Sequence, residues 1–196
     1  AGHFRRALAI EPDHKPSLFG LADAYRRLGR LDEALVGFRR LQSLAPHDSK
    51  AALAMAEIHV GRGELEEALE VVAAAAAAES APALVHNQHG ELLALLGRQE
   101  EAFAELERAL ELNPRLAQAR FNLAVLHEER GEVERAIELY DQAIRRAPRH
   151  FQAQFNLGNL YLEGQGVAAD REEARKWFSR AAKAGHKGAK QALDAL

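Results

Sequence analysis

Glycine returns every 34 residues in this 196-residue chain, at Gly29, Gly63, Gly97 and Gly131. Two more residue types keep the same interval. They are Ala34, Ala68, Ala102 and Ala136, and Pro12, Pro46, Pro114 and Pro148, with Ser80 where one proline is missing. A period of this size is typical of helical hairpins that stack, because one hairpin cannot bury its apolar face alone. The interval therefore predicts an all-α chain of repeated helix pairs.

Each repeat divides into two amphipathic helices. In residues 15–48, apolar side chains recur at helical spacing in both halves: Leu18, Leu21, Ala22 and Tyr25, then Leu31, Ala34, Leu35, Phe38 and Leu41. These stripes predict a first and a second helix of about 13 residues each. Gly29 stands where the first helix needs a left-handed C-terminal residue, and Pro46 stands where the second helix must stop. One small core lies between the two helices.

Charge and composition exclude several classes of protein. The chain has 26 Lys and Arg against 29 Asp and Glu, a net charge of -3, and no long block of like charge, which excludes nucleic acid as a partner. Without cysteine there are no disulfides and no thiolate metal sites, which fits a cytoplasm or a periplasm equally. No apolar run reaches the roughly 20 residues of a membrane span, so we expect a soluble chain with no membrane insertion.

The start of the chain has its own features. It begins in mid-repeat without Met and lacks the apolar core of a signal peptide, so we expect a piece of a longer protein. The abundance of Ala and Arg suggests a bacterial source.

The recurring residues resemble the tetratricopeptide repeat family. Its pattern of Leu, small, aromatic, Gly, Ala, aromatic, Ala and Pro is met most fully in residues 117–150, by Leu123, Ala124, His127, Gly131, Ala136, Tyr140, Ala143 and Pro148. Residues 15–48 match nearly as well, and units 49–82 and 83–116 depart further. Residues 1–14 look like the second helix of a partial unit. The resemblance implies a right-handed α-solenoid, or superhelix, of antiparallel hairpins in one continuous domain.

The last repeat is lengthened. After the turn at Gly164–Val167, Ala174 follows Ala136 by 38 residues instead of 34. With Trp177, Phe178 and Gly185, residues 151–186 are similar to a Sel-one-like repeat, a relative with the same hairpin and a longer loop. Residues 187–196 are expected to form a capping helix that covers the last hairpin.

No constellation in the sequence points to catalysis. Adjacent glutamates such as Glu66 and Glu67 diverge by about 100° on a helix and cannot share a substrate. His86 and His89 share a helix face, but they occupy core positions and no third metal ligand is evident. His59 and His127 replace a repeat aromatic and are expected to pack with one polar edge outward. The chain is predicted not to be an enzyme and to need no metal or cofactor.

The resemblance also implies where a partner would lie. In this family the first helices line a groove, with partner-facing residues at positions 2, 5, 9 and 12 of each unit. On that basis the groove residues are Phe19, Asp23, Arg26, Leu53, Glu57, Asn87, Glu91, Phe121, Glu128, Phe155 and Asn159. This mostly apolar, partly acidic surface suits an amphipathic or extended segment with some Lys or Arg. Alternatively, the position 5 aromatics only pack against neighbouring helices.

The functional prediction is a protein-interaction scaffold that binds a peptide or helix in this groove. The carboxylate clamp by which some relatives hold chaperone tails needs Lys and Asn at positions 5 and 9, where Phe19 and Asp23 stand, so that role is disfavoured. Two alternatives stay open. One is a self-assembly module, in which the groove or the N-terminal helix packs against a second copy. The other is a substrate-recruiting arm of a larger enzyme chain.

Overall fold

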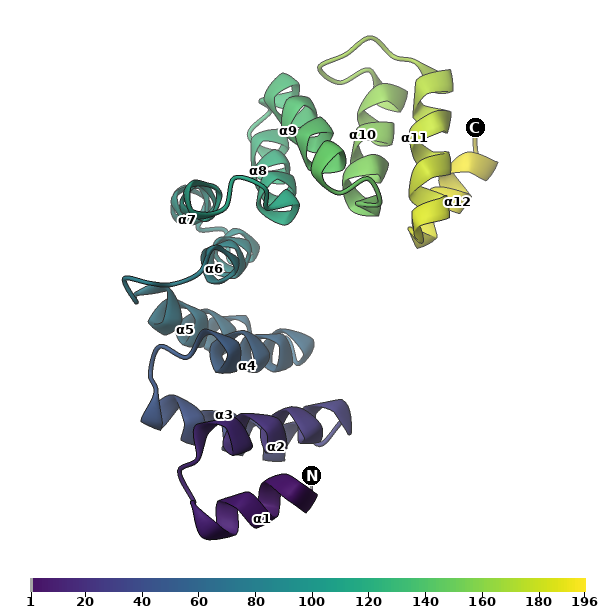
Figure 1. Ribbon diagram of the computed structural model, residues 1–196. Helices are drawn as coiled ribbons and strands as arrows, with labels where there is room; N and C mark the ends of the chain where they lie inside the picture. Colours follow the sequence, from purple (N-terminus) through teal and green to yellow (C-terminus); the bar gives the residue numbers. More distant parts are fainter. Residues whose placement is uncertain (1) are drawn as a thin grey trace. The chain divides into compact units, whose positions relative to one another are not determined.

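The structure is a computed structural model that describes residues 2–196, and over this range it contains twelve α-helices and no strand (Figure 1). The all-α prediction is confirmed. The chain forms two compact units, Ala1–Ala102 and Phe103–Leu196, and the boundary between them falls within α7. The expectation that all repeats form one continuous domain stays a prediction, and each unit is described separately below.

Unit 1 contains one single helix and two complete hairpins, followed by the first helix of a third. Its helices are α1 (Gly2–Ile10), α2 (Lys15–Arg27), α3 (Leu31–Leu44), α4 (Ser49–Gly61), α5 (Leu65–Ala76) and α6 (Ala83–Leu95). The first helices α2, α4 and α6 each have 13 residues, as the sequence pattern predicts. α2 packs against α3, and α4 packs against α5.

Unit 2 contains most of α7 (Gln99–Leu112) and two complete hairpins. The first hairpin pairs α8 (Ala117–Glu129) with α9 (Val133–Arg146), and the second pairs α10 (Phe151–Glu163) with α11 (Arg171–Ala184). The short helix α12 (Lys187–Asp194) packs against α11.

The periodic glycines close the turns inside the hairpins. Gly29, Gly63, Gly97 and Gly131 have φ between +73° and +77°, a left-handed conformation that costs glycine little. After α2, the Gly29 N–H donates to the Arg26 carbonyl and the Arg30 N–H donates to the Tyr25 carbonyl, both at 3.0 Å. These two bonds form a Schellman motif, which satisfies carbonyls left free at a helix end. The sequence prediction for these glycines is therefore confirmed.

Alanines and aromatics share the work of packing the hairpins. Ala34, Ala68, Ala102 and Ala136 are fully buried, so small side chains stand where helices approach most closely. Large buried rings fill the remaining space, namely Phe38 in unit 1 and Tyr140 and Phe178 in unit 2.

The lengthened turn of the last hairpin runs between α10 and α11. Gly164 ends α10 in a left-handed conformation, and the Asp170 carboxylate begins α11 by accepting the N–H groups of Glu172 and Glu173 at 2.9 Å. Gly158 lets α10 approach α11 closely, since a Cβ there would lie 2.7 Å from the Phe178 ring. Among the twelve helices, none has both the length and the apolar character to cross a membrane.

Candidate functional site

The position 5 phenylalanines contribute to both the core and the surface. Each is half-buried on a first helix and touches an aromatic ring on the second helix of its own hairpin. Phe19 lies 5.6 Å from Phe38 between ring centroids. The equivalent pairs in unit 2 are Phe121 with Tyr140 at 5.8 Å and Phe155 with Phe178 at 5.4 Å. These phenylalanines therefore close the hairpin core and leave part of each ring accessible.

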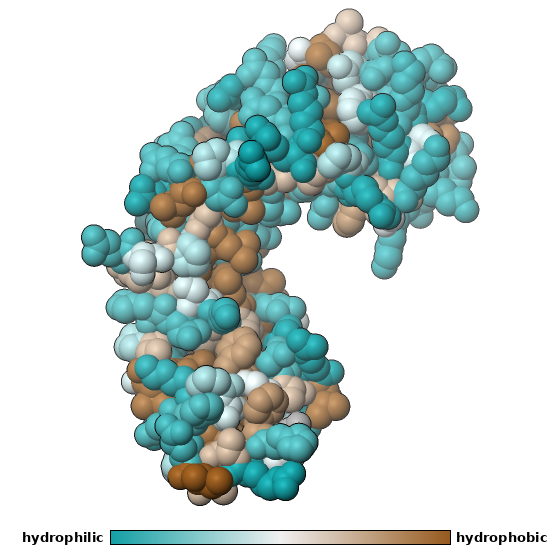
Figure 2. Space-filling view, in the orientation of Figure 1, coloured by the Kyte–Doolittle hydropathy of each residue, from teal (hydrophilic) through white to brown (hydrophobic). Residues whose placement is uncertain are grey.

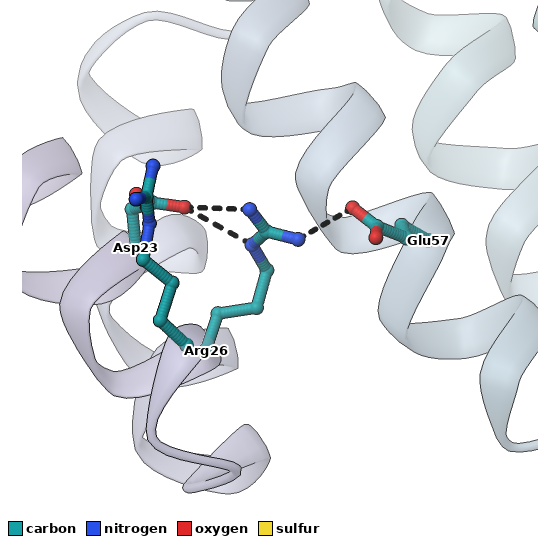
Figure 3. A network of polar contacts seen from close by, with 4 residues as sticks. Asp23, Arg26 and Glu57 are labelled. Carbon is teal, nitrogen blue, oxygen red and sulfur yellow. Dashed lines mark hydrogen bonds and ion pairs between the residues drawn. The ribbon is translucent and has the colours of Figure 1, made fainter.

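In unit 1, Arg26 holds the acidic side chains of α2 and α4 together (Figure 3). Its Nη2 donates to Asp23 Oδ1 at 2.8 Å, and its Nη1 donates to Glu57 Oε2 at 2.7 Å. The bond from Arg26 lowers the pKa of Asp23 against the opposing effect of burial, and it raises the pKa of Arg26. Arg27 adds a second bond to Asp23 at 2.7 Å. This part of the predicted acidic row is therefore neutralised within the unit.

The other predicted residues of unit 1 differ in accessibility. Leu53 is half-buried against the core, whereas Asn87 is only 2% exposed and too enclosed to contact a peptide. Glu91 is half-buried, and burial raises its pKa. Three apolar side chains on the same first helices are exposed: Val60, Leu84 and Leu95. Figure 2 shows apolar residues gathered over α4 and α6.

In unit 2, three polar side chains connect α8, α9 and α10. The Tyr140 hydroxyl donates to Glu128 Oε2 at 2.6 Å, and Asn156 Nδ2 donates to the Tyr140 oxygen at 2.9 Å. Burial raises the pKa of Tyr140, and the bond to Glu128 raises it further, so the hydroxyl remains a neutral donor. Glu128, predicted as a groove residue, is thus held in a fixed position by the core.

Amide side chains accompany Phe121 and Phe155 on α8 and α10. Five of them are half-buried: Gln118, Asn122, Gln152, Asn156 and Asn159. Gln118 Nε2 donates to Asn122 Oδ1 at 3.1 Å. Because an amide can donate and accept, such a row matches the alternating groups of a peptide backbone. The sequence analysis named Asn159 and missed the others, although their recurrence after 34 residues, as in Gln118 and Gln152, was a usable signal.

Two histidines also contact the phenylalanines of unit 2 and were not predicted. His150 lies 4.8 Å from the Phe121 ring, and His186 stacks on Phe155 at 4.0 Å. Each begins a helix, since His150 Nδ1 accepts the Ala153 N–H at 3.3 Å and His186 Nδ1 accepts the Ala189 N–H at 3.1 Å. Burial lowers the pKa of both imidazoles. The rings are thus tied to the starts of α10 and α12.

Comparison with known families now agrees with this architecture. Tetratricopeptide repeat models match residues 3–36, 29–92 and 96–148, and a Sel1 repeat model matches residues 151–186. The chain belongs to the tetratricopeptide repeat family. Both resemblances drawn from the sequence are confirmed, including the Sel1 repeat inferred from the lengthened turn. As a member of this family, the chain is a protein-interaction scaffold.

Relatives show the same repeats within longer proteins. The tetratricopeptide repeat-containing protein trd-1 of Caenorhabditis elegans is 30% identical over 144 residues, which are 73% of this chain and 18% of trd-1. The human protein O-mannosyl-transferase TMTC3 is 26% identical over 190 residues, 89% of this chain and 21% of TMTC3. The chain thus spans about a fifth of these curated relatives. The crystal structure of MamA superposes with a TM-score of 0.68 at 26% identity, covering 86% of this chain and 96% of MamA.

The histidines at the hairpin turns of this TPR chain have structural partners. His59 Nδ1 lies 2.6 Å from Glu64 Oε2, and His127 Nδ1 lies 2.6 Å from Glu132 Oε2 across the equivalent turn. His59 is 4% exposed and contributes to the hairpin core. Within residues 2–196, no group of three or more His, Cys, Asp or Glu side chains is placed to hold a metal ion.

Proposed function

We propose that the chain is an adaptor that binds a peptide segment on the first-helix faces of its hairpins. The observation that carries this proposal is the surface of α8 and α10 in unit 2. There, two half-buried phenylalanines, Phe121 and Phe155, stand among five half-buried amides. Such a face offers apolar contact for side chains and hydrogen bonds for an extended backbone.

The first-helix face of unit 1 supports a different kind of contact. Its exposed Val60, Leu84 and Leu95 on α4 and α6 would receive an apolar helix face. Glu91, on α6, makes no ion pair with another described residue, and its partial burial would strengthen its attraction to a Lys or Arg of the partner. The proposed partner is therefore amphipathic, with a basic residue where it meets unit 1.

Site-specific photo-crosslinking tests the proposal for unit 2. A photoreactive amino acid would replace Val125 on α8 or Asn159 on α10, and a control would carry it at the exposed Gln191 on α12. We expect both groove positions to crosslink the same partner peptide in source-cell lysate, identified by mass spectrometry. Crosslinking of that peptide at equal yield from Gln191 would contradict the proposal.

A second pair of variants measures the contribution of the rings. Phe121→Ala and Phe155→Ala should each weaken binding of the identified peptide by roughly 1–3 kcal/mol, or about five- to a hundred-fold. Circular dichroism must show that each variant is still helical, because both rings also contact the core. Unchanged affinity in folded variants would move the site elsewhere. The proposal requires no chemistry of the chain itself, so a catalytic activity of residues 1–196 would contradict it.

Self-association is a second candidate function, supported by an apolar hollow of about 280 Å³ between α2 and α3. Leu18, Leu21 and Tyr25 line it, together with Val36, whose surface is 69% exposed. Light scattering across a range of concentrations would detect a dimer, and Val36→Glu should dissociate it. A monomer at every concentration would exclude this function.

A further inference from the structure

A second surface of unit 2 lies between the C-terminal ends of the second helices α9 and α11. It contains a cavity of about 420 Å³ lined by Ile144, Pro148, Arg149, Gln154, Arg180, Lys183 and Ala184. None of these residues belongs to the proposed peptide groove. The cavity therefore requires its own explanation.

The floor of this cavity is apolar and held in place. Ile144 is 8% exposed and lies at the end of α9, and Ala184 ends α11. Gln154, in the first turn of α10, is 2% exposed and donates from Nε2 to the Pro148 carbonyl at 2.8 Å. That bond fixes the turn between α9 and α10, which carries Arg149. The cavity is thus preformed rather than a gap that side chains would fill.

The rim of the cavity is cationic. Arg149, Arg180 and Lys183 are exposed, and none forms an ion pair with a carboxylate in the described part of the chain. Arg180 lies over the Trp177 ring at 4.7 Å, which restricts its position. No acidic side chain lines the cavity. Three positive charges around an apolar floor repel one another, and a bound anion would relieve that repulsion.

A second hollow, on the same stretch of α9, extends the positive surface. It measures about 410 Å³ and is lined by Arg120, Gln142, Arg145 and Arg146. Arg120 Nε donates to Gln142 Oε1 at 3.2 Å, while its buried Nη1 has no hydrogen-bond partner among residues 2–196. Burial lowers the pKa of Arg120, and the nearby charge of Arg146 lowers it further. Positive charge is therefore concentrated along this face although the whole chain is acidic.

We propose that this face of unit 2 binds an acidic peptide segment with one aliphatic side chain. The aliphatic group would enter the cavity between Ile144 and Ala184, and flanking carboxylates would contact Arg149, Arg180 and Lys183. A peptide fits better than a nucleic acid, because the floor is apolar and the described residues that line the two hollows include no aromatic ring for base stacking. Cation and carboxylate pairs would orient the segment.

Selection from a random dodecapeptide display library against the full 196-residue chain tests the proposal. We expect enrichment of peptides with Asp or Glu on both sides of a Leu, Ile or Val. Absence of such sequences among the enriched peptides would overturn the proposal. An enriched acidic peptide, labelled with fluorescein, then serves as the probe for anisotropy titrations.

Matched variants locate the binding site of that peptide. Combining Arg149→Ala, Arg180→Ala and Lys183→Ala should weaken binding at least about tenfold, since each exposed pair contributes modestly. The control combines Arg108→Ala, Arg135→Ala and Lys176→Ala, which removes as many charges from residues that already pair within unit 2. Equal weakening by both triple variants would indicate general electrostatic attraction and overturn the proposal.

Two further measurements separate the cavity from other sites. Ala184→Met should fill the cavity and weaken the acidic peptide, with thermal unfolding as the check on folding. Val125→Arg, on the first-helix face, should leave this peptide unaffected. If Val125→Arg abolishes binding instead, the acidic peptide lies in the groove, which overturns this inference and leaves the proposed groove intact. Displacement of the peptide by inorganic phosphate or single-stranded DNA at comparable concentrations would reveal a general anion site and also overturn it.

Discussion

Two histidines in unit 2 make its stability depend on pH. His150 and His186 accept backbone N–H groups through Nδ1 at the starts of α10 and α12, and only an unprotonated nitrogen can accept such a bond. The same rings contact Phe121 and Phe155 of the proposed groove. Protonation would therefore remove two helix caps and disturb the two groove rings together.

The direction of the effect follows from the pKa of each imidazole. In the unfolded chain both histidines titrate near 6.5, and burial lowers the pKa of both in the folded unit. The unfolded chain thus binds more protons in this range, so the free energy of unfolding is constant above about pH 6.5 and decreases as the pH falls below it. A lost N-cap bond costs about 1 kcal/mol, so losing both should cost about 2 kcal/mol.

Asparagine substitutions provide the test, because Asn offers a capping oxygen that does not titrate in this range. The double variant His150→Asn and His186→Asn should keep its stability at about pH 7.5 and lose most of the decrease measured for the wild type at about pH 5. Guanidinium unfolding followed by circular dichroism measures both values. His47→Asn, at an exposed histidine, is the control and should retain the wild-type slope. If the double variant also retains that slope, these two caps do not cause it.

Two further predictions concern packing and charge. Gly158→Ala should lower the free energy of unfolding by about 1–3 kcal/mol, because the new Cβ would lie 2.7 Å from the buried Phe178 ring; Gly61→Ala, with nothing within 4 Å, should be neutral or stabilise by up to about 1 kcal/mol. Thermal denaturation compares the two. Arg26→Ala should cost about 0.5–1 kcal/mol at low salt and less at high salt, since its bonds to Glu57 and its neighbours are partly exposed. A cost unchanged by salt would show that packing of the arginine stem, not charge, is responsible.

The helical framework was readable from the sequence because each signal is local. Gly29 must adopt positive φ at a hairpin turn, and Leu18 and Ala22 mark one buried face of α2 whichever partner the helix meets. The 34-residue interval repeats these signals, so an error in one unit is corrected by the others. The lengthened turn before Asp170 was visible for the same reason, as a break in that interval.

The details of the candidate site depend on neighbours that a repeat pattern does not specify. Asn87 occupies the same position as Phe121, yet its shorter side chain is buried while part of the phenylalanine is accessible. His150 and His186 precede helices and were outside the positions that the family pattern assigns to the groove. Their contacts with phenylalanines require the fold of the chain between them. The cationic cavity at α9 and α11 likewise joins residues from three helices and a turn.

Charge shows most clearly why position-by-position reading is insufficient. Asp23 and Glu57 both look like acidic contacts for a basic partner, but Arg26 binds both and cancels much of their attraction within unit 1. In unit 2 the reverse holds, because Arg149 and Arg180 have no paired carboxylate among the described residues, although the sequence as a whole is acidic. Partner preference should therefore follow the unpaired charges of each face and not the net charge of the chain. This reasoning assigns a basic contact to Glu91 and an acidic one to the face of α9 and α11.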